Sequence, residues 1–194
     1  MLTIFGTLFG TTAAASAKLF SSIVAADFLT GLLHWSEDTW TVPGRSKLLD
    51  RFIVLDNIDH HRRPGLIRAG DYWGTNRVCI ALAAFGACVA LFAHVHAWPV
   101  YLVLALVSQS NQIHMWAHCS NPPRLVARLQ RLGILQSTSH HAVHHKRPYA
   151  VRFCALTNFL NPVLDALGFW RSLEWVIVSC GGTVVRACAA RGGY

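Results

Sequence analysis

Hydrophobic residues are concentrated in three long runs, which polar connections separate. Leu19–Trp35 is apolar over a length near the lower limit for a membrane-spanning helix, and Val78–Ala97 has the full length. A third run begins at Val100, turns polar near residue 108 and continues to His118. We therefore predict about three transmembrane helices, the first of them starting between Thr11 and Lys18.

The segments outside these runs are predicted to lie at the membrane surface. Residues 36–77 form a polar connection with several prolines and glycines. Residues 124–132 alternate an arginine stripe with a leucine stripe, which is typical of a helix in the headgroup plane. Residues 153–177 are apolar but interrupted by polar side chains, so we expect an interfacial or re-entrant segment. The predicted fold is a single all-α membrane helical bundle over residues 1–194.

Composition agrees with the membrane class. Hydrophobic residues make up 53% of the chain and charged residues only 13%, about half the share usual in soluble domains. The net charge of +8 favours contact with anionic lipid headgroups, whereas nucleic acid is excluded because the basic residues form no recognition helix. None of the six cysteines forms a CxxC pair, which indicates free thiols.

Histidines fall in four groups at the ends of the apolar runs or between them. The nine members are His34, His60, His61, His114, His118, His140, His141, His144 and His145. A path of three spans brings all nine to one face, while His94 and His96 lie at the opposite turn. Nearly all basic residues lie on the nine-histidine side, so the positive-inside rule predicts that this face is cytoplasmic.

The histidine spacing predicts metal binding. His114 and His118 are four residues apart, as are His140 and His144, so each pair shares a helical face. Nine imidazoles exceed the four ligands of a structural zinc site and suit two metal ions. Imidazole binds iron, copper and zinc, and spacing alone does not choose among them. The alternative is a set of solvated histidines at the headgroup surface.

Acidic residues near the histidines are candidates for orienting them. Asp27 lies inside the first apolar run, where a carboxylate requires a polar partner. Asp27, His34 and Asp38 fall at helical spacing and share a face. We predict that Asp27 has a polar partner, in the first place a ligand histidine.

The ordered motifs resemble the plasmanylethanolamine desaturase (CarF-like, Kua-like) family of membrane lipid desaturases, and more distantly the chloroplast desaturase of phosphatidylglycerol palmitoyl chains. The matching motifs, spread over about residues 25–178, are ADF at 26–28, GLLHW at 31–35, DTW at 38–40, DHH at 59–61, NQIHMWAH at 111–118, SHHAVHH at 139–145 and FWRSLE at 169–174. The resemblance implies two iron ions, O2 as co-substrate and an external electron donor of the cytochrome b5 or ferredoxin type. It implies the nine histidines as ligand candidates, although eight would suffice. It also implies Asp38 as a possible ligand, since it follows His34 where a second histidine is usual, and Asp27, Asp38 or Asp59 as carboxylates that orient the imidazoles.

The expected activity is removal of two hydrogens from adjacent carbons of a membrane phospholipid chain, first the vinyl-ether bond of a plasmalogen. A fatty-acyl desaturase or a lipid hydroxylase would use the same site, and a non-enzymatic membrane metal-binding protein is an alternative of another class. Candidate substrate-binding residues are Asn111, Gln112, Arg62, Arg63 and Lys146. The segment 108–112 either lines the path of the lipid chain or supports the ligands.

Overall fold

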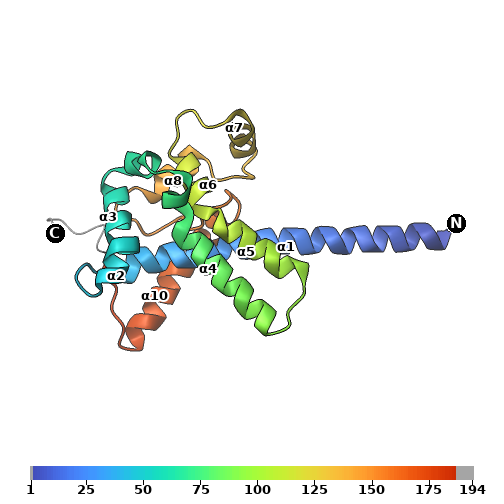
Figure 1. The fold of residues 1–194 in the computed structure, drawn as a ribbon, viewed down its shortest axis with the longest axis horizontal. Coiled ribbons are helices and arrows are strands. Elements are labelled where there is room, and N and C mark those ends of the chain that lie inside the picture. Colours follow the sequence, from blue (N-terminus) through green and yellow to red (C-terminus); the bar gives the residue numbers. More distant parts are fainter. Residues whose placement is uncertain (1, 187–194) are drawn as a thin grey trace.

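A computed structural model describes residues 2–186, with side chains described from residue 11 onward except at residue 69. Over this part of the chain the fold is entirely helical and contains no strand. The longest element is α1 (Leu2–Trp40), about 58 Å long at 1.5 Å per residue. Figure 1 shows that its N-terminal half extends alone beyond the other helices, and residues 11–21 are exposed there. This exposure of an apolar helix fits a lipid environment.

Two helices, rather than the predicted three, are long and apolar enough to cross a membrane. They are residues 11–40 of α1 and α4 (Tyr72–Phe92). The third apolar run is divided into α5 (Trp98–Ser108) and α6 (Ser110–Ala117), because the helix breaks at Gln109. α5 packs antiparallel to α4 and also against α1. The predicted third span is therefore a short apolar helix followed by a polar one.

The connection between α1 and α4 is more helical than its prolines and glycines suggest. α2 (Lys47–Leu49), the π-helical turn η1 (Asp50–Val54) and α3 (Leu55–Arg62) follow one another without a break. The 3-10 helix η2 (Pro64–Ala69) comes next, and Asp71 caps α4 by accepting a hydrogen bond from the backbone N–H of Gly74. The consequence is that the end of α3 carries its histidines into the bundle, where His60 and His61 are buried.

The C-terminal third consists of short helices around a buried extended segment. α7 (Arg124–Arg131) keeps its three arginines exposed, as expected for an interfacial helix, and α8 (Thr138–His144) follows it. Residues 153–157 are buried in the core, so the expectation of an interfacial segment is wrong for them. α9 (Leu160–Ala166) and α10 (Phe169–Ser179) complete the fold, and α10 packs on α9.

Packing of α1 against the buried segment depends on Gly31. A Cβ there would lie 2.7 Å from Cys154 Sγ and 3.2 Å from the Cys154 backbone nitrogen, which is too close for any side chain. The main core cluster, which includes Trp35, Phe153 and Trp170, surrounds this contact. The five described cysteines are free thiols, as predicted, and Cys188 lies outside the described residues.

Candidate metal centre

One side of α1 is directed toward the histidines of α3, α6 and α8. The predicted shared face is present: Asp27, Gly31, His34 and Asp38 are all buried. α3, α6 and α8 bring their histidines to the C-terminal half of α1, far from the tip of the α4–α5 hairpin (Figure 1). His94 and His96 lie at that tip and are exposed, as expected.

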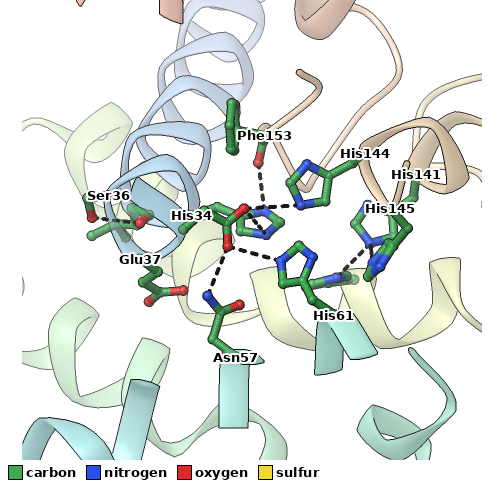
Figure 2. A network of polar contacts seen from close by, with 12 residues as sticks. His34, Ser36, Glu37, Asn57, His61, His141, His144, His145 and Phe153 are labelled. Carbon is green, nitrogen blue, oxygen red and sulfur yellow. Dashed lines mark hydrogen bonds and ion pairs between the residues drawn. The ribbon is translucent and has the colours of Figure 1, made fainter. Parts of the chain in front are cut away.

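The first group of potential ligands is made of His34, Asp38, His61 and His144, whose ligand atoms all lie within 4.8 Å of one another. Asp38 is at its centre. Its Oδ1 lies 2.9 Å from His61 Nε2, and its Oδ2 lies 3.3 Å from His144 Nε2 and 3.7 Å from His34 Nε2 (Figure 2). We call these four residues the inner group, because every member is buried.

The second group consists of five histidines, His60, His114, His118, His141 and His145, again with ligand atoms within 4.8 Å of one another. The Nε2 atom of His141 lies 2.7 Å from that of His114 and 3.0 Å from that of His145. His118 and His145 are partly exposed, whereas the other three are buried. We call these five residues the outer group.

The donor set fits two metal ions. Many buried ligand atoms lack a hydrogen bond: His34 Nε2, both nitrogens of His60 and His61, His118 Nε2, His144 Nε2 and Asp38 Oδ2. His61 Nε2 is close to Asp38, but the two are not aligned as a hydrogen bond. Burying this many unpaired polar atoms is costly, and a metal bound by the converging lone pairs would remove that cost. Imidazole and carboxylate ligands are compatible with iron.

Backbone carbonyls orient two imidazoles of the inner group. His34 Nδ1 donates to Phe153 O at 3.1 Å, and His144 Nδ1 donates to Val151 O at 2.8 Å. Each bond fixes the proton on Nδ1 and leaves Nε2 as the lone-pair nitrogen facing Asp38. The segment that supplies both carbonyls is therefore part of the site, although it contributes no ligand.

Asp27 anchors that segment. Its Oδ1 accepts the backbone N–H groups of Leu156 (2.9 Å) and Thr157 (3.2 Å), and its Oδ2 accepts the Thr157 hydroxyl at 2.5 Å. Thr30 and Gln136 bond other backbone groups of the same segment. The predicted pairing of Asp27 with a histidine is not found. Asp27 acts on the site through the segment that orients His34 and His144.

His140 is the one predicted ligand that lies outside both groups. Its Nδ1 lies 2.8 Å from the Arg152 guanidinium, and its Nε2 lies 3.2 Å from the side-chain nitrogen of Asn161. Because Asn161 also pairs with both backbone groups of Cys154, its NH2 faces the imidazole. His140 thus joins α8 to the following loop. Eight histidines together with Asp38 are the candidate ligands that the structure brings together.

A cavity of about 410 Å3 leads to the two groups from between α1, η1 and α4. Three histidines of the two groups line it together with apolar and charged side chains. The lining includes His34, His60, His114, Leu33, Phe52, Leu66, Val78, Leu82, Glu37, Asp56, Asp59 and Arg77. Asn111 also lines it, but its amide donates to Thr75 O. Gln112 lies outside it and accepts a hydrogen bond from Asn76.

The remaining predicted residues lie on the surface. Arg62, Arg63 and Lys146 are exposed and do not line the cavity. Asp59 lies at the edge of the cavity, where its carboxylate is 3.7 Å from the Arg63 guanidinium, and the structure brings it to no ligand nitrogen. The structure thus places the candidate ligands in the interior and the basic candidates around them.

Electrostatics keep the outer histidines neutral, which is the state that binds metal. Burial, aided by repulsion from other histidines and from Arg68, lowers the pKa of His118 to about 4. Burial and the neighbouring His144 lower the pKa of His145 to about 2, and burial holds that of His60 far below its usual value. At neutral pH these rings present lone pairs rather than positive charge.

Some residues of the site were not foreseen from the sequence. Asn57 donates from its side chain to Asp38 Oδ1 at 2.9 Å and helps to fix that carboxylate (Figure 2). Glu37 lines the cavity. Asn161 and Gln136 hold the buried segment through Cys154 O. A polar side chain inside an apolar stretch was the available signal for Asn161, whereas Asn57 and Glu37 lie in a polar stretch where nothing distinguishes them.

The fold combines long apolar helices with two convergent sets of imidazoles, as in a membrane protein with a clustered-histidine site. A family model for the lipid desaturase domain matches residues 23–188. The chain belongs to this family and is therefore an oxidoreductase of lipid metabolism. The match covers all eight histidines of the two groups.

Relatives with described activities agree with the family. The chain is 28% identical over 192 residues to the plasmanylethanolamine desaturase of Myxococcus xanthus and 29% identical over 177 residues to plasmanylethanolamine desaturase 1 of Mus musculus. It is 29% identical over 168 residues to the chloroplastic fatty acid desaturase 4-like 2 of Arabidopsis thaliana. These matches cover 92%, 84% and 81% of this chain, and 67%, 65% and 58% of the relatives. No solved structure matches the chain.

Proposed function

We propose that this protein is an O2-dependent di-iron desaturase of membrane phospholipids, and that the vinyl-ether bond of a plasmalogen is its first-choice product. The observation that carries the proposal is the pair of ligand groups beside a cavity that contains a set of apolar side chains. One group has four members, the other has five, and the rings of His34 and His114, one from each group, have centroids 5.3 Å apart. Two metals would thus lie side by side next to the cavity.

The position of the cavity supports a lipid substrate. α1 and α4, the two candidate membrane helices, form two of its sides, so a chain could enter from the bilayer without crossing water. The apolar lining residues would hold methylene groups, and the side lined by His34, His60 and His114 would receive the carbons to be oxidised. Excluding water at this point protects the reaction from side products.

The chain's residues hold, orient and shield the metals. His34, Asp38, His61 and His144 would bind one iron, and the five outer histidines would bind the other. Bound iron supplies the oxidising power that unactivated C–H bonds require, which no amino-acid side chain has. In the balanced reaction, O2 accepts two hydrogens from adjacent carbons, two electrons from a donor protein and two protons, and two waters and one double bond are formed. The Phe153 and Val151 carbonyls keep two imidazoles aimed at the metal throughout.

A fatty-acyl desaturase is the second candidate. The chloroplastic relative is as similar to this chain as the mouse plasmanylethanolamine desaturase, at 29% identity each. Both reactions remove two hydrogens from adjacent carbons and use the same site, so they differ only in how the lipid is seated in the cavity. A lipid hydroxylase would add an oxygen instead.

The topology completes the proposal. The histidine-bearing ends of α3 and α8 carry exposed Arg62, Arg63, Lys146 and Arg147. Basic residues beside apolar spans favour the cytoplasmic side, so we place this face in the cytoplasm. A carrier of the cytochrome b5 or ferredoxin type would deliver electrons there.

Metal analysis together with lipid analysis tests the function. Protein purified with iron should contain two irons per chain, and a host expressing it should gain a vinyl-ether or a new alkene in its phospholipids. His144→Ala should lose the inner iron and all product. His140→Gln is the matched control, because His140 lies outside both groups. It should keep both irons.

The masses of the products separate the alternatives. Desaturation removes two hydrogens, whereas hydroxylation adds one oxygen. Acid hydrolysis releases an aldehyde from a vinyl ether but not from an acyl alkene. One zinc per chain in both the parent and His144→Ala, with unchanged lipids, would refute the di-iron desaturase and leave a non-enzymatic metal-binding protein.

A further inference from the structure

Two of the histidine pairs are followed by the same kind of sequence. His60-His61 precedes Arg62-Arg63-Pro64, and His144-His145 precedes Lys146-Arg147-Pro148. The first pair ends α3 and the second ends α8, so each pair of potential ligands is followed directly by two positive charges. Metal binding does not require these charges, since neither doublet belongs to a ligand group.

The histidine pairs that precede the two doublets come together in space. The ring centroid of His145 lies 4.8 Å from that of His60 and 4.9 Å from that of His61, so α3 and α8 end beside each other. Arg68 of η2 is near enough to His118 to act on it electrostatically. All five basic side chains are exposed. We call Arg62, Arg63, Arg68, Lys146 and Arg147 the basic rim.

Arg63 has an acidic neighbour on the rim. Asp59 lies 3.7 Å from it, and both are more than half exposed, so the pair is weak. Asp56 faces Arg77 instead, on the side of the cavity. The exposed positive charges of the rim would attract a negatively charged partner over about a Debye length, roughly 10 Å at 0.1 M salt.

The outer group reaches the surface of the described structure at two residues. His118 and His145 are partly exposed, while all four inner residues are buried. Lys146 and Arg147 directly follow His145, so an electron donor in contact with the rim would lie beside a partly exposed imidazole of the outer group.

We propose that the basic rim is the docking site of an acidic one-electron carrier protein, which delivers electrons through the outer group. This inference rests on the proposed desaturase function, whose balanced reaction needs two electrons from outside the chain for each O2. The carrier is oxidised by one electron in each of two encounters, and no bond forms between the proteins. Complementary charge raises the rate of such encounters by 10- to 1,000-fold.

A phospholipid headgroup would also be attracted by positive charge, but the structure favours a protein. None of the five rim residues lines the cavity, where a bound lipid would place its reacting chain. The exposed arginines of α7, alongside exposed Leu125 and Leu132, offer a separate amphipathic surface for the membrane.

Charge reversal tests the rim. The variant Arg62→Glu/Lys146→Glu is compared with Arg124→Glu/Arg128→Glu on α7, which changes the net charge equally. Iron-loaded protein in neutral phosphatidylcholine nanodiscs is mixed with the reduced haem domain of cytochrome b5 or with reduced plant-type ferredoxin, and carrier oxidation is followed by stopped flow. A single turnover gives a reference rate for each variant: the iron-loaded protein is reduced with dithionite, the excess is removed, and product is measured after O2 is admitted.

We expect the ratio of carrier-driven to chemically driven rate to fall at least 10-fold in the rim variant and less than 2-fold in the α7 variant. The parent's carrier rate should fall with added salt, and the rim variant's should not. Binding of dye-labelled carrier by fluorescence anisotropy should follow the same order, and this reading does not depend on turnover.

Unchanged ratio and unchanged carrier binding in the rim variant would overturn the docking site while leaving the desaturase intact. Absence of product from the parent with every reductant would instead overturn the proposed function, and carrier binding would still decide the rim. If the rim variant loses binding to phosphatidylglycerol vesicles but keeps carrier binding, the surface contacts lipid and the proposal is wrong. Arg62→Gln/Lys146→Gln, a milder change, replaces the reversal should that variant not retain iron.

Discussion

Replacing Asp27 by alanine should open the buried segment and release one metal only. Asp27 accepts three hydrogen bonds from Leu156 and Thr157. Its removal leaves three buried donors without this acceptor, and each such donor costs about 1–3 kcal/mol, so the local cost is at least about 3 kcal/mol. Asp27→Asn keeps one acceptor oxygen of the same shape and should cost about 1–2 kcal/mol.

Thiol labelling of Cys154 measures the opening directly, because that side chain is fully buried in the same segment. A loss of 3 kcal/mol corresponds to more than about a 100-fold rise in labelling rate when opening is rapid and reversible. Asp71→Ala, which removes an exposed cap of α4, is the matched control and should leave Cys154 protected. The labelled protein is analysed residue by residue by mass spectrometry.

The metal content of Asp27→Ala tests which of the two ligand groups depends on Asp27. Phe153 and Val151 orient His34 and His144, which both belong to the inner group. Asp27→Ala should therefore lower the iron content from two to one per chain, while the outer group retains its metal. Parent labelling rates and two irons in Asp27→Ala would refute the argument that this carboxylate supports the site through the backbone.

Three further outcomes are expected. Gly31→Ala should destabilise the protein by about 1–3 kcal/mol in thermal unfolding, because the new methyl meets Cys154. In Gly86→Ala the methyl meets only the movable end of a leucine side chain and should be tolerated, so equal melting temperatures of the two variants would contradict the close packing at Gly31. Asp38→Asn should lose the inner iron by elemental analysis without loss of helical circular dichroism, and retention of both irons would exclude Asp38 as a ligand. In metal-free protein, the pKa of His118 is about 4 when folded and near 6.5 when unfolded, so the unfolded state binds more protons between these values. Stability should be complete above pH 6.5 and fall towards pH 4, and a flat profile over that range would contradict the burial of neutral imidazoles.

The helical class and most of the site can be predicted from two patterns in the sequence, the long apolar runs and the helical spacing of the polar residues. Long apolar runs require helices in lipid, and the four-residue spacing of His114 and His118 places both rings on one side of α6. The shared face of Asp27, His34 and Asp38 follows from the same helical geometry. The five described cysteines are free thiols, as the absence of a CxxC pair predicts.

What the sequence does not predict depends on contacts between distant segments. His140 belongs to the densest histidine stretch, but Arg152 and Asn161 approach it from the other side, and no spacing within 140–145 reveals that. Residues 153–157 are buried because side chains from other segments hold their backbone. Asp27 accepts a hydrogen bond from it, and Gln136 donates one to it. The break at Gln109 likewise separates α5 from α6 in a run that reads as one helix.

A single helix, α1, combines two roles. The same unbroken helix contains a candidate membrane span and, at successive turns, Asp27, Gly31, His34 and Asp38. One added residue between Asp27 and Asp38 would rotate everything beyond it by about 100° and move it by about 1.5 Å. Natural variants of this protein should therefore accept length changes in the turn at residues 41–46, whereas any length change within 27–38 would remove the anchor, the close packing or the ligands in a single step.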